Sequence, residues 1–306
     1  MSEPVLRTRN SGFGGSGYAI PTDLINGKPR IVPGVTTITG VTAKPGIVQW
    51  AVDNTAAYAV ANVDALLSRS HEQGFGFLRW YHKRTPDLAG DPLRSHHVGV
   101  LHDAAELGTA LHEWVEADLL GEFPPAVDSA EMEQMVAAYL GWKSDHDIVV
   151  DEVEATVYNP SAGYAGTLDL IMSVDGGKYL LDIKTSRSVM TEHEQQLAAL
   201  GAASVLLRQV PAGTVGAVGY ESKQHGLTWW VEDVVPEFSK YGVLHVRPDD
   251  YDSDGVPVPA YCALEVVEQW RIDIQFDGFL GALALKDSER RVKAGERARL
   301  SFVDEF

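Results

Sequence analysis

Cysteine is almost absent from this chain: Cys262 is the only one among 306 residues. A single thiol excludes an intramolecular disulfide. Within one chain it also excludes a zinc site built from cysteines and a four-thiolate iron–sulfur cluster. So little cysteine suits a reducing compartment, and we expect the protein in the cytoplasm.

Basic residues are also scarce. The chain has 25 Lys and Arg against 43 Asp and Glu, which gives a formal net charge of −18 at pH 7. Such a chain is not suited to indiscriminate binding of polyanions. A nucleic-acid partner would therefore need a locally basic channel within an acidic surface.

Long apolar runs are missing as well. No apolar stretch approaches the roughly 18 residues of a membrane span, so we expect no membrane partner. The Gly/Ser-rich start of the chain lacks the apolar segment of a secretory signal.

The pattern of apolar residues predicts an α/β protein. Residues 104–120 carry leucine or valine at every fourth position, from Leu107 to Leu119, which is typical of an amphipathic helix. Further helices are predicted at 45–68, 129–145, from Thr191 onward and 267–286, and strands at 148–158, 164–173, 178–185, 214–221, 227–232, 242–247 and 260–266. We expect a loop at HHVGVLH, residues 96–102.

We expect one elaborated domain. It comprises an N-terminal elaboration over about 1–103, a core over about 104–286 and a basic tail over 287–306.

Several polar side chains interrupt segments that otherwise have the composition of a protein core. They are His112 and Glu116 on the helix 104–120, Glu152 and Glu154 on the first strand, Asp169 on the second, and Asp182 and Lys184 on the third. Side chains alternate across a strand, so Asp182 and Lys184 point the same way. Buried carboxylates without a counter-charge are costly, so a protein that collects several must hold a cation among them.

Oxygen ligands with one imidazole favour Mg²⁺ or Mn²⁺ over a soft-ligand metal. A lysine beside such a metal can orient an attacking water or neutralise charge that develops on a phosphoryl oxygen. The set therefore predicts metal-dependent hydrolysis of a phosphodiester. Because a metal-bound imidazole is neutral and an ordinary histidine titrates near ~6.5, metal affinity is predicted to weaken as the pH falls through about 6.5.

The same residues stand in a recognisable order. "GYAGTLDLI" followed by "YLLDIKTS" resembles the Gly-x-x-x-Asp … Asp-x-Lys signature of the PD-(D/E)xK nuclease superfamily. "GTALHEWVE" upstream and "HEQQLAAL" downstream are similar to the Gly-x-x-x-His and glutamine helices of its RecB-type exonuclease branch. "VPGVTTITGVTAKPGIVQWA" is similar to the N-terminal region of phage-encoded exonucleases of this branch.

The resemblance implies a restriction-endonuclease-like core, in which helices flank a mixed central β-sheet. It implies a Mg²⁺- or Mn²⁺-dependent DNA exonuclease without an iron–sulfur cluster, acting in phage recombination or repair in the host cytoplasm. A phage recombination or single-strand annealing protein would be a further partner.

The resemblance also implies roles, carried over position by position. His112, Asp169, Asp182 and the Ile183 carbonyl would bind the metal, Lys184 would serve the water, Gln196 would steady the lysine or the substrate phosphate, and Glu116 and Glu154 would be supporting acids. One departure is Leu200, which stands where many relatives carry a tyrosine, four residues after the glutamine. Whatever that tyrosine does for DNA positioning would be absent or supplied elsewhere.

Other interpretations stay open from the sequence. A structure- or site-specific endonuclease of the same superfamily would share the fold, as would a non-catalytic nucleic-acid-binding module. His112 alone could be a core histidine, and Asp182 with Lys184 could be an ion pair on an exposed edge strand.

The DNA path is less well defined than the metal site. LRWYHKR places Arg79, Lys83 and Arg84 beside aromatic side chains, a composition that suits a nucleic-acid strand and equally suits a surface helix with core aromatics. The basic tail is the next candidate. A ring-shaped homo-oligomer would gather basic residues in its lumen.

Overall fold

The computed structural model describes residues 6–8, 15–41, 45–73, 92–222, 225–252 and 254–303. The described residues form two compact units, one within Met1–Thr42 and Leu111–Phe306 and the other within Ala43–Ala110. The predicted division into elaboration, core and tail stays a prediction. The proposed DNA contacts Arg79, Lys83 and Arg84 lie outside the described residues.

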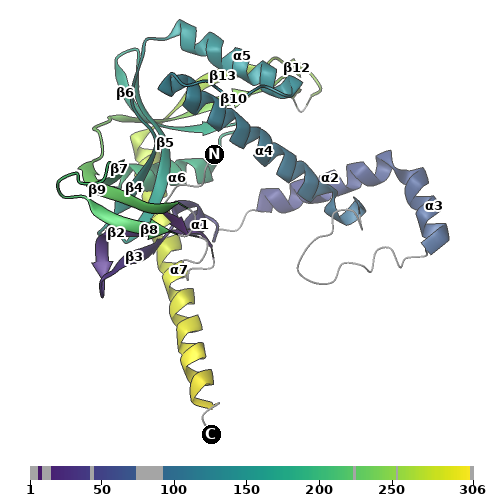
Figure 1. The fold of residues 1–306 in the computed structure, drawn as a ribbon. Helices are drawn as coiled ribbons and strands as arrows, with labels where there is room; N and C mark the ends of the chain where they lie inside the picture. Colours follow the sequence, from purple (N-terminus) through teal and green to yellow (C-terminus); the bar gives the residue numbers. More distant parts are fainter. Residues whose placement is uncertain are drawn as a thin grey trace. The chain divides into compact units, whose positions relative to one another are not determined.

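The larger unit is built on an eight-stranded mixed sheet (Figure 1). Its strands are β4 (Ile148–Asn159), β5 (Tyr164–Val174), β6 (Gly177–Lys184), β7 (Val205–Val210), β8 (Val218–Ser222), β9 (Gly226–Val234), β10 (Lys240–Arg247) and β13 (Tyr261–Val267). Their order is β13-β10-β6-β5-β4-β7-β9-β8. Strands β6 and β10 run parallel, and the other neighbouring pairs of this sheet run antiparallel.

The central strands are buried on both faces, which requires cover on each side. Neighbouring strand residues point to opposite faces, and Leu180 and Leu181 of β6 are at most 1% exposed. Helices α6 (Thr191–Gly201) and α7 (Gln269–Val303) and the short α1 (Val35–Thr39) pack together on the main core. Helix α5 (Ala130–Asp145) lies against β10 and β13. The predicted fold class, an α/β protein with a mixed central sheet flanked by helices, is confirmed.

A small antiparallel sheet brings the start of the chain to the main sheet. It comprises β1 (Arg7–Thr8), β2 (Gly17–Ile25) and β3 (Lys28–Pro33). Tyr18 and Val32 share a buried cluster with Tyr158 and Trp230 of the main sheet, and Gly34 bridges to Ala165 of β5. A further two-stranded sheet joins β11 (Asp250–Tyr251) and β12 (Pro257–Val258).

The helices differ from the predictions mainly in length. Helix α4 runs Pro92–Leu120, so HHVGVLH is helical and the predicted loop is wrong. That stretch contains no proline, and Pro92 suits the first position of a helix because proline has no N–H to leave unpaired. Helix α7 continues through the basic tail to Val303, because Ala, Glu, Lys and Arg are good helix formers.

The smaller unit contains α2 (Pro45–Ala61), α3 (Val63–Gln73) and the first part of α4. The predicted helix 45–68 is thus two helices. The rings of Tyr58 and His96 lie 4.6 Å apart within this unit. In the part of the chain that is described, no helix has both the length and the apolar character needed to cross a membrane.

Candidate active site

The register of three neighbouring strands aligns Glu154, Asp169 and Asp182 in one row across the main sheet. In the ladders, Val153 pairs with Leu170, Ala155 with Leu168, and Leu170 with Leu181. Side chains opposite one another on neighbouring strands point to the same face. Strand pairing therefore gathers on one face three acids that are far apart in the chain.

The backbone pairing of β5 with β6 ends at this row. Beyond it, a side chain of β5 accepts a hydrogen bond from the backbone of β6. Asp169 Oδ2 accepts a hydrogen bond from the Ile183 backbone N–H at 2.8 Å. This bond fixes the carboxylate against the strand that carries Lys184. Burial raises the pKa of Asp169, while the Lys184 charge and the Ile183 N–H oppose that shift.

His112 reaches the row from α4 and is held through one ring nitrogen. Its Nε2 lies 2.8 Å from the Ile183 carbonyl oxygen, and its Nδ1 lies 3.6 Å from Asp169 Oδ2. Burial, with the nearby Lys184 charge, lowers the pKa of His112 to about 4, so the ring is neutral at neutral pH. A neutral ring that donates through Nε2 presents a lone pair on Nδ1 toward the Asp169 carboxylate. Two facing acceptors favour a cation between them.

Asp182 and Lys184 form a close ion pair. Lys184 Nζ lies 2.6 Å from Asp182 Oδ2, and Asp182 is 1% exposed. The other oxygen, Oδ1, is buried and accepts no hydrogen bond from the described residues. Burial raises the pKa of Asp182 to about 6, although the Lys184 charge works against the shift. A buried carboxylate with unused acceptor positions can serve a metal or a water.

Lys184 remains a cation in this setting. Burial alone would lower its pKa, but the charges of Asp182 and Asp169 outweigh burial and hold its pKa above the ordinary value. Its Nζ also donates to the Ile183 carbonyl oxygen at 3.2 Å. A lysine that keeps its proton can donate hydrogen bonds or neutralise charge, but it cannot accept a proton as a general base.

Two glutamates complete the acidic cluster. Glu154 has a left-handed backbone with φ 48°, an uncommon conformation for a residue other than glycine. Burial raises its pKa to about 8, and the charges of Asp169 and Glu116 add to the shift. Burial also raises the pKa of Glu116, which follows His112 by one helical turn.

The geometry favours a ligand set slightly different from the predicted one. Ligand atoms of His112, Glu154 and Asp169 lie within 4.8 Å of one another. Asp182, predicted as a ligand, directs its carboxylate to Lys184, and the Ile183 carbonyl is engaged by His112 and Lys184. The individual roles stay predictions.

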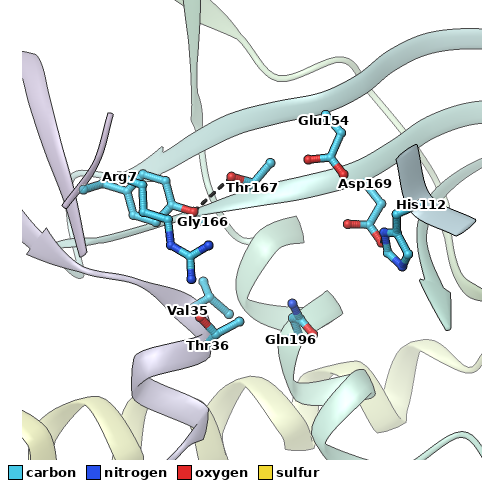
Figure 2. A pocket seen from close by; sticks show the side chains of 10 residues that line it. Arg7, Val35, Thr36, His112, Glu154, Gly166, Thr167, Asp169 and Gln196 are labelled. Carbon is cyan, nitrogen blue, oxygen red and sulfur yellow. Dashed lines mark hydrogen bonds and ion pairs between the residues drawn. The ribbon is translucent and has the colours of Figure 1, made fainter. Parts of the chain in front are cut away.

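A pocket of about 150 Å³ opens beside these residues, and Figure 2 shows the side chains that line it. His112, Glu154 and Asp169 lie at one side, and Gln196 reaches the pocket from α6. Glu152, by contrast, pairs with Arg208 at 2.6 Å and does not line the pocket.

Arg7 lines the same pocket, although the sequence around it does not predict a site residue. Its guanidinium points into the pocket near Thr36 (Figure 2), and its Nη2 donates to Ser16 Oγ at 3.3 Å. The only sequence signal was a basic residue in a Gly/Ser-rich start. The β1–β2 pairing, which brings Arg7 opposite Tyr18, places it here.

No family model matches the chain, and no curated protein matches it. Among solved structures, it is similar to the alkaline exonuclease LHK-Exo from Laribacter hongkongensis, at 16% identity and a TM-score of 0.31. The match covers 63% of this chain and 85% of that one, and the same exonuclease in complex with dAMP matches equally. A superposition of this quality supports no functional conclusion by itself.

Proposed function

We propose that this protein is a metal-dependent deoxyribonuclease that hydrolyses phosphodiester bonds. The observation that carries the proposal is the row of three acids beside a neutral histidine and a lysine that keeps its charge. Asp182 Oδ2 pairs with Lys184 Nζ at 2.6 Å, while its Oδ1 is buried without a hydrogen-bond donor among the described residues. An ion pair needed only for stability would not require the further acids and the imidazole.

The donor set suits a hard divalent cation. Carboxylate oxygens with one imidazole are the ligands expected for Mg²⁺ or Mn²⁺. His112 Nδ1, Glu154 and Asp169 would hold the ion, with Asp182 as a further ligand once its carboxylate turns from Lys184. Such an ion, when bound, polarises a phosphoryl oxygen and lowers the pKa of a water.

Four further residues would have separate roles in catalysis and DNA binding. Lys184, as a cation, would donate to the attacking water or to a phosphoryl oxygen on which charge develops. Gln196 would hold the substrate phosphate or steady Lys184, and Glu116 would tune the charge of Glu154. Arg7, at the opposite side of the pocket, would bind a phosphate of the DNA backbone, a contact that guanidinium geometry suits.

The specific form of the proposal is an end-dependent exonuclease in phage recombination or repair. It rests on the resemblance of the four motifs and of the N-terminal segment. An endonuclease of the same superfamily would need no DNA end, and a binding module would not turn over. A recombination or single-strand annealing protein and a homo-oligomer remain part of the proposal on the same grounds.

The test is digestion of end-labelled linear, nicked and closed circular DNA with Mg²⁺, Mn²⁺ or EDTA. We expect cleavage of linear DNA with either metal, none with EDTA, and no attack on closed circles. Lys184→Met should lower the rate by about 10²–10³ or more, the cost of losing a group that stabilises transition-state charge.

Lys178→Met is the matched control. Lys178 lies at the other end of β6 and pairs with Asp151 at 3.3 Å, away from the acidic row. It should keep wild-type rates. Cleaved circles would indicate the endonuclease. DNA binding without metal-dependent cleavage would indicate a non-catalytic nucleic-acid-binding module.

A further inference from the structure

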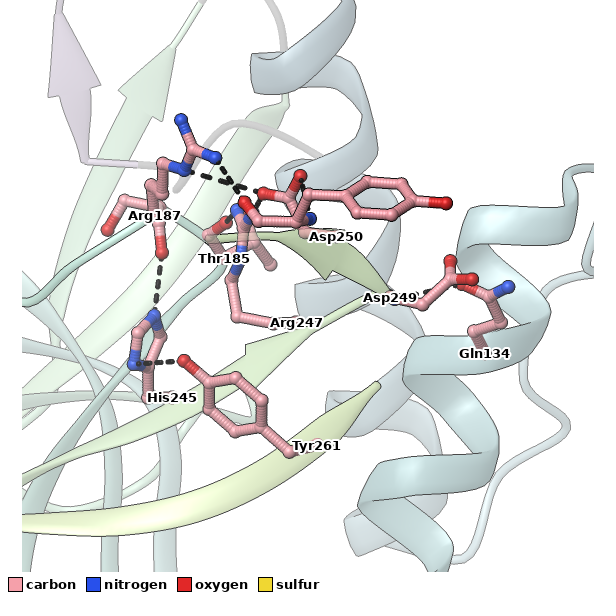
Figure 3. A network of polar contacts seen from close by, with 10 residues as sticks. Gln134, Thr185, Arg187, His245, Arg247, Asp249, Asp250 and Tyr261 are labelled. Carbon is pink, nitrogen blue, oxygen red and sulfur yellow. Dashed lines mark hydrogen bonds and ion pairs between the residues drawn. The ribbon is translucent and has the colours of Figure 1, made fainter. Parts of the chain in front are cut away.

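The chain directly after Lys184 is held by side chains of β10. Parallel pairing of β6 with β10 ends at Lys184 and His245. Beyond that point His245 Nε2 lies 2.6 Å from the Ser186 carbonyl oxygen, and Arg247 Nη1 donates to the Thr185 carbonyl oxygen at 2.7 Å. Figure 3 shows both contacts. Two consecutive carbonyls after the lysine therefore accept from side chains of a neighbouring strand.

Both ring nitrogens of His245 have polar partners. Its Nδ1 lies 2.6 Å from Glu265 Oε1 and 3.2 Å from the Tyr261 hydroxyl, both on β13. A carbonyl oxygen only accepts, so Nε2 donates to Ser186, while Nδ1 contacts the Glu265 carboxylate and the Tyr261 hydroxyl, which can donate or accept. The side chain is 2% exposed, so water cannot take either position. Its register partner on β6 is Lys184. The distances fit a ring that donates from Nε2 to the segment after Lys184 and is held at Nδ1 by β13.

The segment after Lys184 is also held by hydrogen bonds and ion pairs of two arginines. Arg187 Nη2 donates to the Tyr251 carbonyl oxygen at 2.6 Å, and its Nε lies 3.5 Å from Asp250 Oδ2. Arg247 Nη2 donates to the same Asp250 carboxylate at 2.8 Å. His245 is the most buried of these groups, and it connects the segment to β13.

We infer that His245 is a positioning residue for the proposed hydrolase. Its ring connects the Ser186 carbonyl to Glu265 and Tyr261 of β13, and so fixes the backbone that leaves Lys184. The direction of the Lys184 side chain follows from that backbone. The inference rests on the proposed function for its catalytic consequence, but the bridge itself does not.

Removal of the bridge should reduce turnover more than binding. A shift of about 1 Å in a catalytic group can cost about 10²-fold in rate. We expect His245→Leu, which keeps the volume but has no donor, to lower kcat by about 10- to 100-fold. KM for DNA and the Mn²⁺ affinity measured by calorimetry without DNA should change much less. His245→Gln, which can still donate to the Ser186 carbonyl, should recover most of kcat.

Thr228→Val is the matched structural control. Thr228 is a buried residue of β9 that also makes two hydrogen bonds, to Trp230 Nε1 at 2.8 Å and to the Tyr220 carbonyl oxygen at 3.1 Å. It should lower the melting temperature without lowering kcat. An equal loss of kcat in the leucine and glutamine variants, or a loss that Thr228→Val reproduces, would overturn the positioning role.

The bridge can be measured without catalysis. ¹⁵N spectra of ring-labelled wild-type protein, free of metal and DNA, should show a hydrogen-bonded proton on His245 Nε2. A ring that carries its proton on Nδ1 alone would overturn the inference, also if His245→Leu fails to fold. Absence of DNA cleavage by wild-type protein would overturn the proposed function and the catalytic role together, while the spectra would still decide the bridge.

Discussion

Glu154 combines a left-handed backbone with a pKa raised to about 8 by burial and by the charges of Asp169 and Glu116. An unshifted glutamate has a pKa of 4.5. Between these values the folded protein keeps a proton that the unfolded chain has released. The free energy of unfolding therefore falls as the pH rises through this window.

His112 has the opposite effect. Its pKa drops from 6.5 to about 4 on folding, mainly through burial, so between these values the unfolded chain holds the extra proton. Its contribution to stability is lost as the pH falls from 6.5 to about 4. The two effects oppose each other below pH 6.5, whereas from pH 6.5 to 8 the effect of Glu154 dominates.

We predict that metal-free wild-type protein loses stability from pH 6.5 to 8, by at most about 1.4 kcal/mol per pH unit. Glu154→Gln should flatten this slope, because the amide does not ionise. Urea unfolding at several pH values measures both slopes. The exposed Glu221→Gln on β8 should keep the wild-type slope. An unchanged slope in Glu154→Gln would show that Glu154 does not carry the shifted proton.

At the scale of elements, α6 packs tightly on β5. Leu200, which stands where many of the exonucleases that the motifs resemble carry a tyrosine, is 2% exposed and belongs to the main core. A Cβ placed on Gly166 of β5 would lie 2.6 Å from Leu200 Cδ2. Position 200 thus faces the core, and a tyrosine ring there would have to displace neighbouring core side chains.

We predict that Leu200→Tyr destabilises the protein by about 1–3 kcal/mol through overpacking and gives no gain in DNA cleavage. Leu200→Met, which conserves volume, should cost less than about 1.5 kcal/mol. Thermal and urea unfolding measure the cost. A tyrosine variant that is as stable as wild type and more active would contradict the core assignment.

At the scale of the whole molecule, the net charge is −18, so a basic side chain in the pocket is an exception to the acidic character of the chain. Arg7 comes from a separate small sheet and faces the acidic row across the pocket. Phosphate contacts release counterions, so DNA affinity should fall with salt even for an acidic protein.

We predict that Arg7→Gln weakens DNA binding and lowers the slope of log affinity against log salt by about 0.7–0.9, as expected for the loss of one phosphate contact. Lys28→Gln is the matched control, since Lys28 is an exposed residue of the same small sheet outside the pocket. An unchanged slope in Arg7→Gln would move the DNA path elsewhere. Arg79, Lys83, Arg84 and the basic part of α7 would then be the next candidates.

Much of the main sheet follows from the sequence alone. Alternating and continuous apolar runs bounded by glycines predict β4, β5 and β6 to within one residue at each end, because local burial patterns and turn residues set strand limits. The sequence also singles out His112, Asp169, Asp182 and Lys184, since polar side chains in core segments are costly without a use. It misses β7, a run of six residues, VLLRQV, that follows α6 closely.

Only the tertiary structure decides how these residues act together. Strand register aligns Glu154 with Asp169. A small sheet brings Arg7, near the start of the chain, to the same pocket. Burial lowers the pKa of His112 from the expected ~6.5 to about 4. The His245 bridge likewise depends on β10, β13 and the end of β6 meeting in space. Long-range pairing and desolvation cause these effects. Neither is encoded in the local pattern around any one residue.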